Sequence, residues 1–340
     1  MSRSRVTLEP PDTPGEMRQA ARILAGPRKL RCLRTKLTNP LRASSPLGVL
    51  TWPLQRRLAR LVYPPGTQAQ DFLQPPGEPA LLPADSVSWQ IFRNPVALLV
   101  GGIAAVLLEL AEPRVRTGVW EHTSFRELPL PRLQRTGYAA MMTVFGARSR
   151  TETMVRRINA GHARIAGHTP AGVAYRADDV ELLTWVHATA TFGFLQAYVA
   201  CVRPIAAAAR DAYYAENQPS ACLYGVHSPP GSERELEALF ARMKPQLEPS
   251  AIVLEFLSIM QDVPLLPALL RPIQALLVAA AVQTLPADIR ERLGLDQPAW
   301  RLAKWQWRLV CTLGRAADHL SLPTLPAQLA RRRLALPAHE

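Results

Sequence analysis

From about residue 90 onward, apolar side chains recur at helical spacing, and strand-like alternation between turn signals is scarce. The pattern predicts helices over about 96–111, 131–147, 149–166, 179–202, 204–216, 233–246, 250–261, 265–284, 287–294 and 298–317. Capping boxes at Asp178-x-x-Glu181 and Ser232-x-x-Glu235 mark the start of two of these helices. We therefore expect an all-α fold, a single multi-helix bundle over residues 86–320 that is long enough to bury a substantial core.

Basic residues concentrate at the start of the chain. The formal net charge is +13, and residues 1–62 hold 13 Lys and Arg against three acidic residues, whereas residues 63–340 are nearly balanced. Proline is frequent in the same stretch, with 32 in the whole chain. We expect residues 1–85 to form a basic, Pro-rich, partly disordered N-terminal arm, and residues 321–340 to form a loose tail.

Three interpretations of this arm compete. It could be a solvated tail, and it could be a surface for anionic lipid or nucleic acid. Residues 56–62 could form a short basic amphipathic turn, which favours peripheral contact of residues 1–62 with an anionic membrane. No nucleic-acid-binding signature follows the arm, so no nucleic acid partner is expected. A transit peptide is the third possibility, which Glu9, Asp12 and Glu16 disfavour.

No apolar run of signal-peptide length follows the first arginines. The longest apolar stretch, over residues 95–108, is shorter than the ~20 residues that a transmembrane helix needs. We expect neither a signal peptide nor a transmembrane helix, and hence a cytoplasmic protein that is soluble or peripheral to a membrane. Four cysteines without zinc spacing exclude a disulfide scaffold and agree with a reducing compartment.

Two histidines share helix faces with apolar residues. His187 lies on a seam with Val180, Leu183, Ala190 and Phe194, and His162 lies with Met154, Val155, Ile158 and Ile165. Both rings should point inward, where each polar nitrogen needs a partner. A metal or haem iron is one such partner, and a backbone carbonyl or another side chain is the commoner one. No Glu-x-x-His motif occurs, which disfavours a di-iron bundle site.

Arg132, Arg135 and Thr136 follow an i, i+3, i+4 spacing, so one helix face would carry two cations and a hydroxyl. The face could bind a ligand or could simply be a solvated basic surface. The chain has no GxSxG element, no P-loop and no dinucleotide-binding glycine motif that opens a helix after a strand. Those enzyme classes are therefore not indicated.

Several short elements occur together in a specific order and spacing. They are Asn94-Pro95, Gly101-Gly102, Arg132-Leu133-Gln-Arg-Thr136, Phe145-Gly146, His162-Ala-Arg-Ile-Ala-Gly167, Tyr175-Arg-Ala-Asp-Asp179 and Leu183-Thr-Trp-Val-His187. Over residues 88–295 the sequence resembles the MpaB/rubber-oxygenase catalytic domain family. The resemblance implies a globin-like helical bundle that binds haem b through a histidine and uses O2 on a hydrophobic substrate, terpenoid, polyprenoid or lipid-like. It also implies oxidative cleavage of a C=C bond, and membrane association for MpaB-like members.

The resemblance also implies roles for individual residues. A distal Arg-x-x-Lys-Thr element of rubber oxygenases matches Arg132, Arg135 and Thr136, with arginine in place of the lysine. His162 matches the axial iron ligand, with His187 as the alternative ligand or a neighbour of the haem. Glu121 is nearest to a distal glutamate. Arg132 could hold a haem propionate. The competing class is a non-catalytic or degenerate haem-binding or helical scaffold, peripheral to a membrane through its basic arm.

Overall fold

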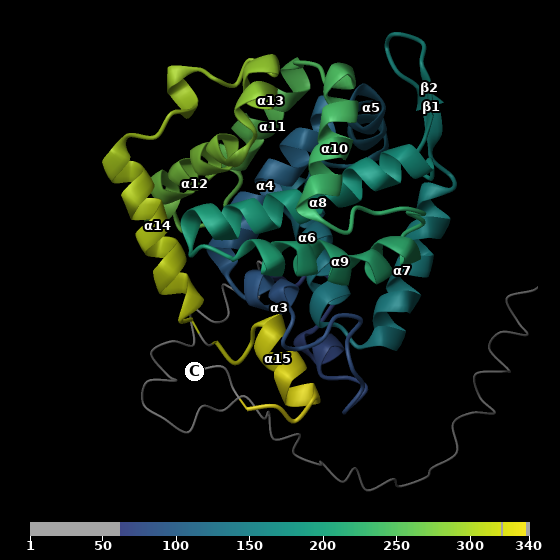
Figure 1. Cartoon of the computed structure of the whole chain (residues 1–340), viewed down its shortest axis with the longest axis vertical. Coiled ribbons are helices and arrows are strands. Elements are labelled where there is room, and N and C mark those ends of the chain that lie inside the picture. Colours follow the sequence, from purple (N-terminus) through teal and green to yellow (C-terminus); the bar gives the residue numbers. More distant parts are fainter. Residues whose placement is uncertain (1–61, 321, 338–340) are drawn as a thin grey trace, which may run out of the picture. The chain divides into compact units, whose positions relative to one another are not determined.

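The computed structural model describes residues 62–320 and 322–337 (Figure 1), so the expectations for residues 1–61 fall outside the described part of the chain. Its helices are α3 (Val87–Phe92), α4 (Pro95–Ala111), α5 (Pro113–His122), α6 (Pro129–Phe145), α7 (Arg148–His162), α8 (Val180–Cys201), α9 (Ala207–Leu223), α10 (Glu233–Met243), α11 (Ala251–Asp262), α12 (Arg271–Thr284), α13 (Ala287–Arg292), α14 (Lys304–Asp318) and α15 (Pro326–Arg333). Short 3-10 turns are η1 (Ala69–Phe72), η2 (Lys244–Gln246), η3 (Ala268–Leu270) and η4 (Pro298–Trp300). The predicted all-α class is confirmed.

The described strands form a single small antiparallel hairpin, which the periodicity did not predict. Strand β1 (Ala166–His168) pairs with β2 (Ala174–Arg176), and Gly167 lies opposite Tyr175. The helix predicted over 149–166 therefore ends at His162, because the chain turns into this hairpin. A β-carbon at Gly167 would lie 2.7 Å from the Tyr175 hydroxyl, so a larger residue at this position would force the Tyr175 ring to move.

The pair α4 and α8 forms the centre of the bundle (Figure 1). The two backbones approach closely at Gly101 and Gly193, where a β-carbon on either residue would lie 2.7 or 2.5 Å from the carbonyl oxygen of the other. Gly101 and Gly193 therefore allow close packing of the two central helices. In Figure 1, α12 and α14 lie on one side of the central pair, and α7 and the hairpin lie on the opposite side.

Polar caps at the helix starts explain why α4 and α8 begin where they do. The Asn94 side chain accepts hydrogen bonds from the amides of Val96 and Ala97 at 3.1 and 3.0 Å, ahead of a first-turn proline. Asp179 caps α8, whereas the predicted cap Asp178 forms an ion pair with Arg176 instead. The other predicted start is confirmed, because Ser232 caps α10.

Short or irregular elements account for the remaining differences. The periodicity missed α3, α5 and α15, and α9 continues to Leu223 with Pro219 inside it. The expectation of a loose tail over 321–340 is wrong for α15. Its Arg333 is buried and donates hydrogen bonds to the carbonyls of Phe72 at 2.9 Å and Glu78 at 2.8 Å.

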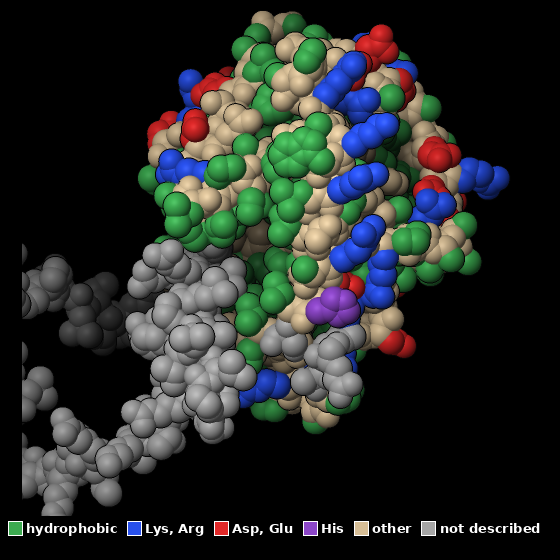
Figure 2. All heavy atoms as spheres, turned by 90° about the vertical axis from the view of Figure 1, so that its left-hand side faces the viewer, with side chains coloured by type: hydrophobic (Ala, Val, Ile, Leu, Met, Phe, Trp, Pro, Cys, Tyr) green, Lys and Arg blue, Asp and Glu red, His purple; other side chains and the backbone are tan. Residues whose placement is uncertain are grey.

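Charged side chains are unevenly placed on the surface. Figure 2, which faces the side of the bundle that carries α14, shows a column of Lys and Arg side chains with hydrophobic side chains beside it. Within the described residues, no single helix has the length and apolar composition needed to cross a membrane. Only α4 and α5 taken together, across a bend of 108°, meet that length and composition test.

Candidate functional site

The polar face of α6 is built around Arg132. Its guanidinium donates a hydrogen bond to the Thr136 hydroxyl one turn further on, and that hydroxyl donates to the Arg132 carbonyl at 3.0 Å. Arg135 is directed elsewhere, since its guanidinium donates to the Ser124 hydroxyl at 3.3 Å. The structure therefore brings together two of the three residues predicted to share this face, and places the third against the segment that precedes α6.

Glu109 on α4 belongs to the same electrostatic neighbourhood. Loss of water around this half-buried carboxyl raises its pKa to about 7, and the positive charge of Arg132 opposes the shift. Burial in turn lowers the pKa of Arg132, whereas Glu109 raises it. The two side chains thus couple α4 to α6. The sequence analysis gave Glu109 no role, although it is the only charged residue in an otherwise apolar helix.

His162 is the last residue of α7 and also lies within the electrostatic reach of Arg132. Burial and the Arg132 charge lower the pKa of its imidazole, and Asp178 partly offsets them. Its Nδ1 atom is buried without a hydrogen-bond partner among the described residues. An imidazole in this setting is neutral near pH 7 and has an unused nitrogen, as an axial metal ligand requires.

His187 lies near the middle of α8. Burial lowers the pKa of its imidazole to about 4, so the ring stays neutral at physiological pH. No described side chain or backbone group forms a hydrogen bond with this ring. The structure thus provides two neutral imidazoles without protein partners, and each could act as a single axial ligand.

The predicted seam of α8 is less enclosed than expected. Its members Leu183, His187, Ala190 and Phe194 are half-buried, whereas the face containing Trp185 is fully buried. Three other helices also present half-buried faces: Leu99, Gly102, Val106 and Glu109 on α4, Arg132, Ala139 and Thr143 on α6, and Met154, Ile158 and His162 on α7. Glu109, Arg132, His162 and His187 therefore all lie on helix faces that the rest of the bundle covers only in part.

Glu121 contacts the hairpin. It is exposed near the end of α5, where the Tyr175 hydroxyl of β2 approaches its carboxylate at 3.4 Å. The neighbouring His122 Nε2 lies 3.1 Å from the same hydroxyl. These contacts hold the hairpin against α5. The acidic side chain that interacts with Arg132 is Glu109, and Glu121 interacts with Tyr175 instead.

A comparison with known families places the helices that carry these residues in one catalytic domain. Residues 89–316 match the family model described as ER-bound oxygenase mpaB/B'/Rubber oxygenase, catalytic domain. The chain belongs to this family. No curated protein and no solved structure matches it. The match confirms the resemblance seen in the sequence and extends it to residue 316, so that α4, α6, α7, α8 and most of α14 lie within an oxygenase catalytic domain.

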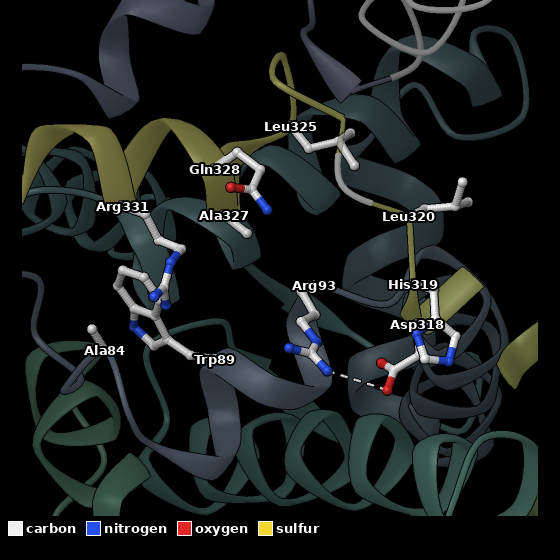
Figure 3. A pocket seen from close by; sticks show the side chains of 10 residues that line it. All are labelled: Ala84, Trp89, Arg93, Asp318, His319, Leu320, Leu325, Ala327, Gln328 and Arg331. Atoms are coloured by element: carbon white, nitrogen blue, oxygen red, sulfur yellow. Dashed lines mark hydrogen bonds and ion pairs between the residues drawn. The ribbon is translucent and has the colours of Figure 1, made fainter. Parts of the chain in front are cut away.

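A small cavity of about 40 Å³ lies between α3 and the segment that follows α14 (Figure 3). It is lined by Trp89 and Arg93 at α3, Asp318 at the end of α14, and Arg331 of α15, among others. Arg93 forms an ion pair with Asp318 at 3.2 Å. The cavity has room for one or two water molecules. Neither His162 nor His187 lines it, so it is distinct from the histidine-bearing faces.

In the part of the chain that the structure describes, no three His, Cys, Asp or Glu side chains come together as potential metal ligands. The oxygenase domain therefore offers single imidazoles there rather than a cluster of protein ligands. A haem iron takes four ligands from its macrocycle and needs one imidazole from the protein.

We expect Glu109→Gln to stabilise the oxygenase domain at neutral and alkaline pH. The folded pKa of about 7 lies above the ordinary value of 4.5, so the folded state retains a proton that the unfolded state releases between these pH values. The corresponding stability is present below pH 4.5 and is lost as the pH rises through 7. The glutamine cannot ionise, so the variant should gain in free energy of unfolding relative to the wild type as the pH rises, reaching about 3 kcal/mol above pH 7.

Urea unfolding at a series of pH values measures this difference. Glu291→Gln, at an exposed carboxyl on α13, is the matched control and should unfold in parallel with the wild type at every pH. A pH-independent difference between Glu109→Gln and the wild type would show that folding does not raise the pKa of Glu109.

Proposed function

We propose that this chain is a haem b-dependent oxygenase that uses O2 on a hydrophobic, terpenoid-, polyprenoid- or lipid-like substrate, with oxidative C=C cleavage as the reaction. The observation that carries the proposal is the pair of half-buried imidazoles, His162 and His187, whose pKa values are lowered by burial and which have no hydrogen-bond partners among the described residues. Membership of an oxygenase family supports the reaction class. Bound haem b would supply the one-electron and O2 chemistry.

We assign the axial ligand to His162 and keep His187 as the alternative. His162 terminates α7, so its ring is held by the helix end while its Nδ1 remains unpaired. Arg132 lowers its pKa and keeps the ring in the neutral form that binds a metal. In this assignment His187 forms part of the haem surroundings, with its neutral ring on the half-buried face of α8.

Arg132 would hold a haem carboxylate by a charge-assisted hydrogen bond, with Thr136 orienting its guanidinium. Arg135 supplies a second positive charge near the rim of the site. It would not replace a lysine as an iron ligand, because a guanidinium stays protonated. We assign to Glu109, rather than Glu121, the acidic role beside Arg132. A carboxyl whose pKa is about 7 can hold or release a proton near neutral pH.

The apolar part of the α8 face suits a hydrophobic substrate. Val186, Ala190 and Phe194 are half-buried rather than sealed inside the bundle. Aliphatic and aromatic side chains of this kind exclude water from a bound hydrocarbon and give it a large contact area. In the proposal, this face positions the substrate chain, while Arg132 and Glu109 remain on the polar side of the site.

The test is spectroscopic and kinetic. The full chain is produced with a haem precursor, its absorption spectrum is recorded, and O2 uptake is followed with polyprenoid and terpenoid substrates. A Soret band and substrate-dependent O2 uptake are expected. Bound haem without O2 uptake on any such substrate would favour the non-catalytic scaffold, and absence of a Soret band would overturn the haem proposal itself.

A further inference from the structure

The outer face of α14 carries positive charges that the fold does not neutralise. Lys304, Arg308 and Arg315 are exposed and lie on one face of the helix, and none forms an ion pair with any described residue. Arg301, just before the helix, is also exposed and pairs with Asp296 at 2.9 Å. They lie on the α14 side of the domain, on which Figure 2 shows a column of Lys and Arg side chains.

The single acidic residue of α14 does not offset these charges. The side chain of Asp318 is only 8% exposed and forms ion pairs with Arg93 and Arg203 on its inner side. A partner that binds this helix would therefore need an anionic surface to match its positive charge. We refer to Arg301, Lys304, Trp305, Arg308 and Arg315 as the α14 face.

Apolar side chains are also exposed on α14 and in the neighbouring η3 turn. Trp305 is 64% exposed although it belongs to a helix whose other side is packed into the core. Leu269 is 92% and Leu270 is 41% exposed in η3, which leads directly into α12, and α12 packs against α14. A nearly bare leucine costs free energy in water unless another apolar phase covers it.

We propose that the α14 face, together with Leu269 and Leu270, docks the domain on the surface of a membrane rich in anionic phospholipid. Lys and Arg would contact lipid phosphates, Trp305 would lie at the headgroup level, and the leucines would enter the acyl boundary. This docking is independent of the proposed haem chemistry, because none of its residues belongs to the histidine-bearing faces.

Charge complementarity selects this occupant over the alternatives. A second copy would place like charges against each other, and residues 1–62 of this chain carry a formal net charge of +10. A nucleic acid would match the cations, but it would leave Leu269 in water. A lipid surface satisfies both the cations and the exposed apolar side chains.

Vesicle binding by the full chain tests the proposal. Vesicles of phosphatidylcholine with and without phosphatidylglycerol are compared for the wild type and the double variant Lys304→Glu/Arg308→Glu. Each Lys or Arg near an anionic surface contributes about fivefold in affinity, so the double variant should bind the anionic vesicles at least roughly 25-fold more weakly. Leu269→Ser should weaken binding without changing its salt dependence, because it removes no charge.

The matched control is Arg156→Glu/Arg157→Glu, which makes the same charge change at exposed positions on α7, on the opposite side of the bundle (Figure 1). Its affinity for the anionic vesicles should be only slightly lower than that of the wild type. Any contribution of the N-terminal arm to vesicle binding is the same in every variant. Hydrogen exchange with and without vesicles then locates the contact. Slower exchange in residues 264–272 and 301–320 is expected.

Three results would overturn the proposal. One is equal binding by the wild type and Lys304→Glu/Arg308→Glu, and another is exchange protection confined to residues 1–62. The third is that duplex DNA competes with the vesicles, binds the protein more tightly than they do, and binds Lys304→Glu/Arg308→Glu more weakly than the wild type. The α14 face would then be a nucleic-acid-binding surface.

Discussion

Replacing His162 by alanine is expected to abolish the retention of haem by this chain. The substitution removes the imidazole that we assign as the axial ligand, and alanine provides no atom that can bind the iron. The Soret absorption of protein produced with a haem precursor should fall to background. Added imidazole should restore part of it, because the small ligand can occupy the space that the side chain leaves.

Two further substitutions make this result specific. His187→Ala should retain haem with a shifted spectrum, because it alters the surroundings of the cofactor and not its ligand. His227→Ala, at an exposed histidine that follows α9, should match the wild type in both amount and spectrum. Loss of the Soret band in His187→Ala with retention in His162→Ala would transfer the ligand assignment to α8.

The substitution Gly193→Val is expected to lower the stability of the domain by about 3 kcal/mol or more. A β-carbon at this position would lie 2.5 Å from the Gly101 carbonyl oxygen and 3.0 Å from the Ala105 amide nitrogen. Both contacts are with the backbone of α4, so relief requires the two central helices to separate. Urea unfolding followed by far-UV circular dichroism measures the loss.

Gly137→Ala provides the control for this substitution. Gly137 lies inside α6 with nothing within 4 Å of an added β-carbon, so alanine should raise stability by roughly 0.5–1 kcal/mol through helix propensity. If Gly193→Val unfolded at the same urea concentration as the wild type, the backbones of α4 and α8 would not be in close contact at Gly101 and Gly193.

The long helices could be predicted because their packing follows directly from local spacing. The apolar seams of α4 and α8 recur every three or four residues, and the caps Asn94 and Ser232 fix where helices begin. By contrast, α3 and the hairpin are too short for periodicity to be informative. Asp178 and Asp179 are adjacent acceptors, and only the ion pair of Asp178 with Arg176 decides which one caps α8.

The candidate site was predictable only where its residues share a helix. Arg132 and Thr136 are one turn apart, so their contact follows from sequence spacing. The electrostatic interaction of Arg132 with Glu109 depends on how α6 lies relative to α4, which spacing does not determine. For the same reason, sequence spacing could not show that Glu121, the acidic residue that the resemblance suggests, lies against Tyr175 of the hairpin.

The contacts of α15 have a consequence for when the domain can be completed during synthesis. Arg333 donates hydrogen bonds to carbonyls of Phe72 and Glu78, more than 250 residues earlier, and the Gly77 amide donates to the Arg333 carbonyl at 2.8 Å. Until residue 333 has left the ribosome, these backbone groups of the early segment lack their partners. Residues 69–80 should therefore remain open to proteases and chaperones until translation of the domain is almost finished.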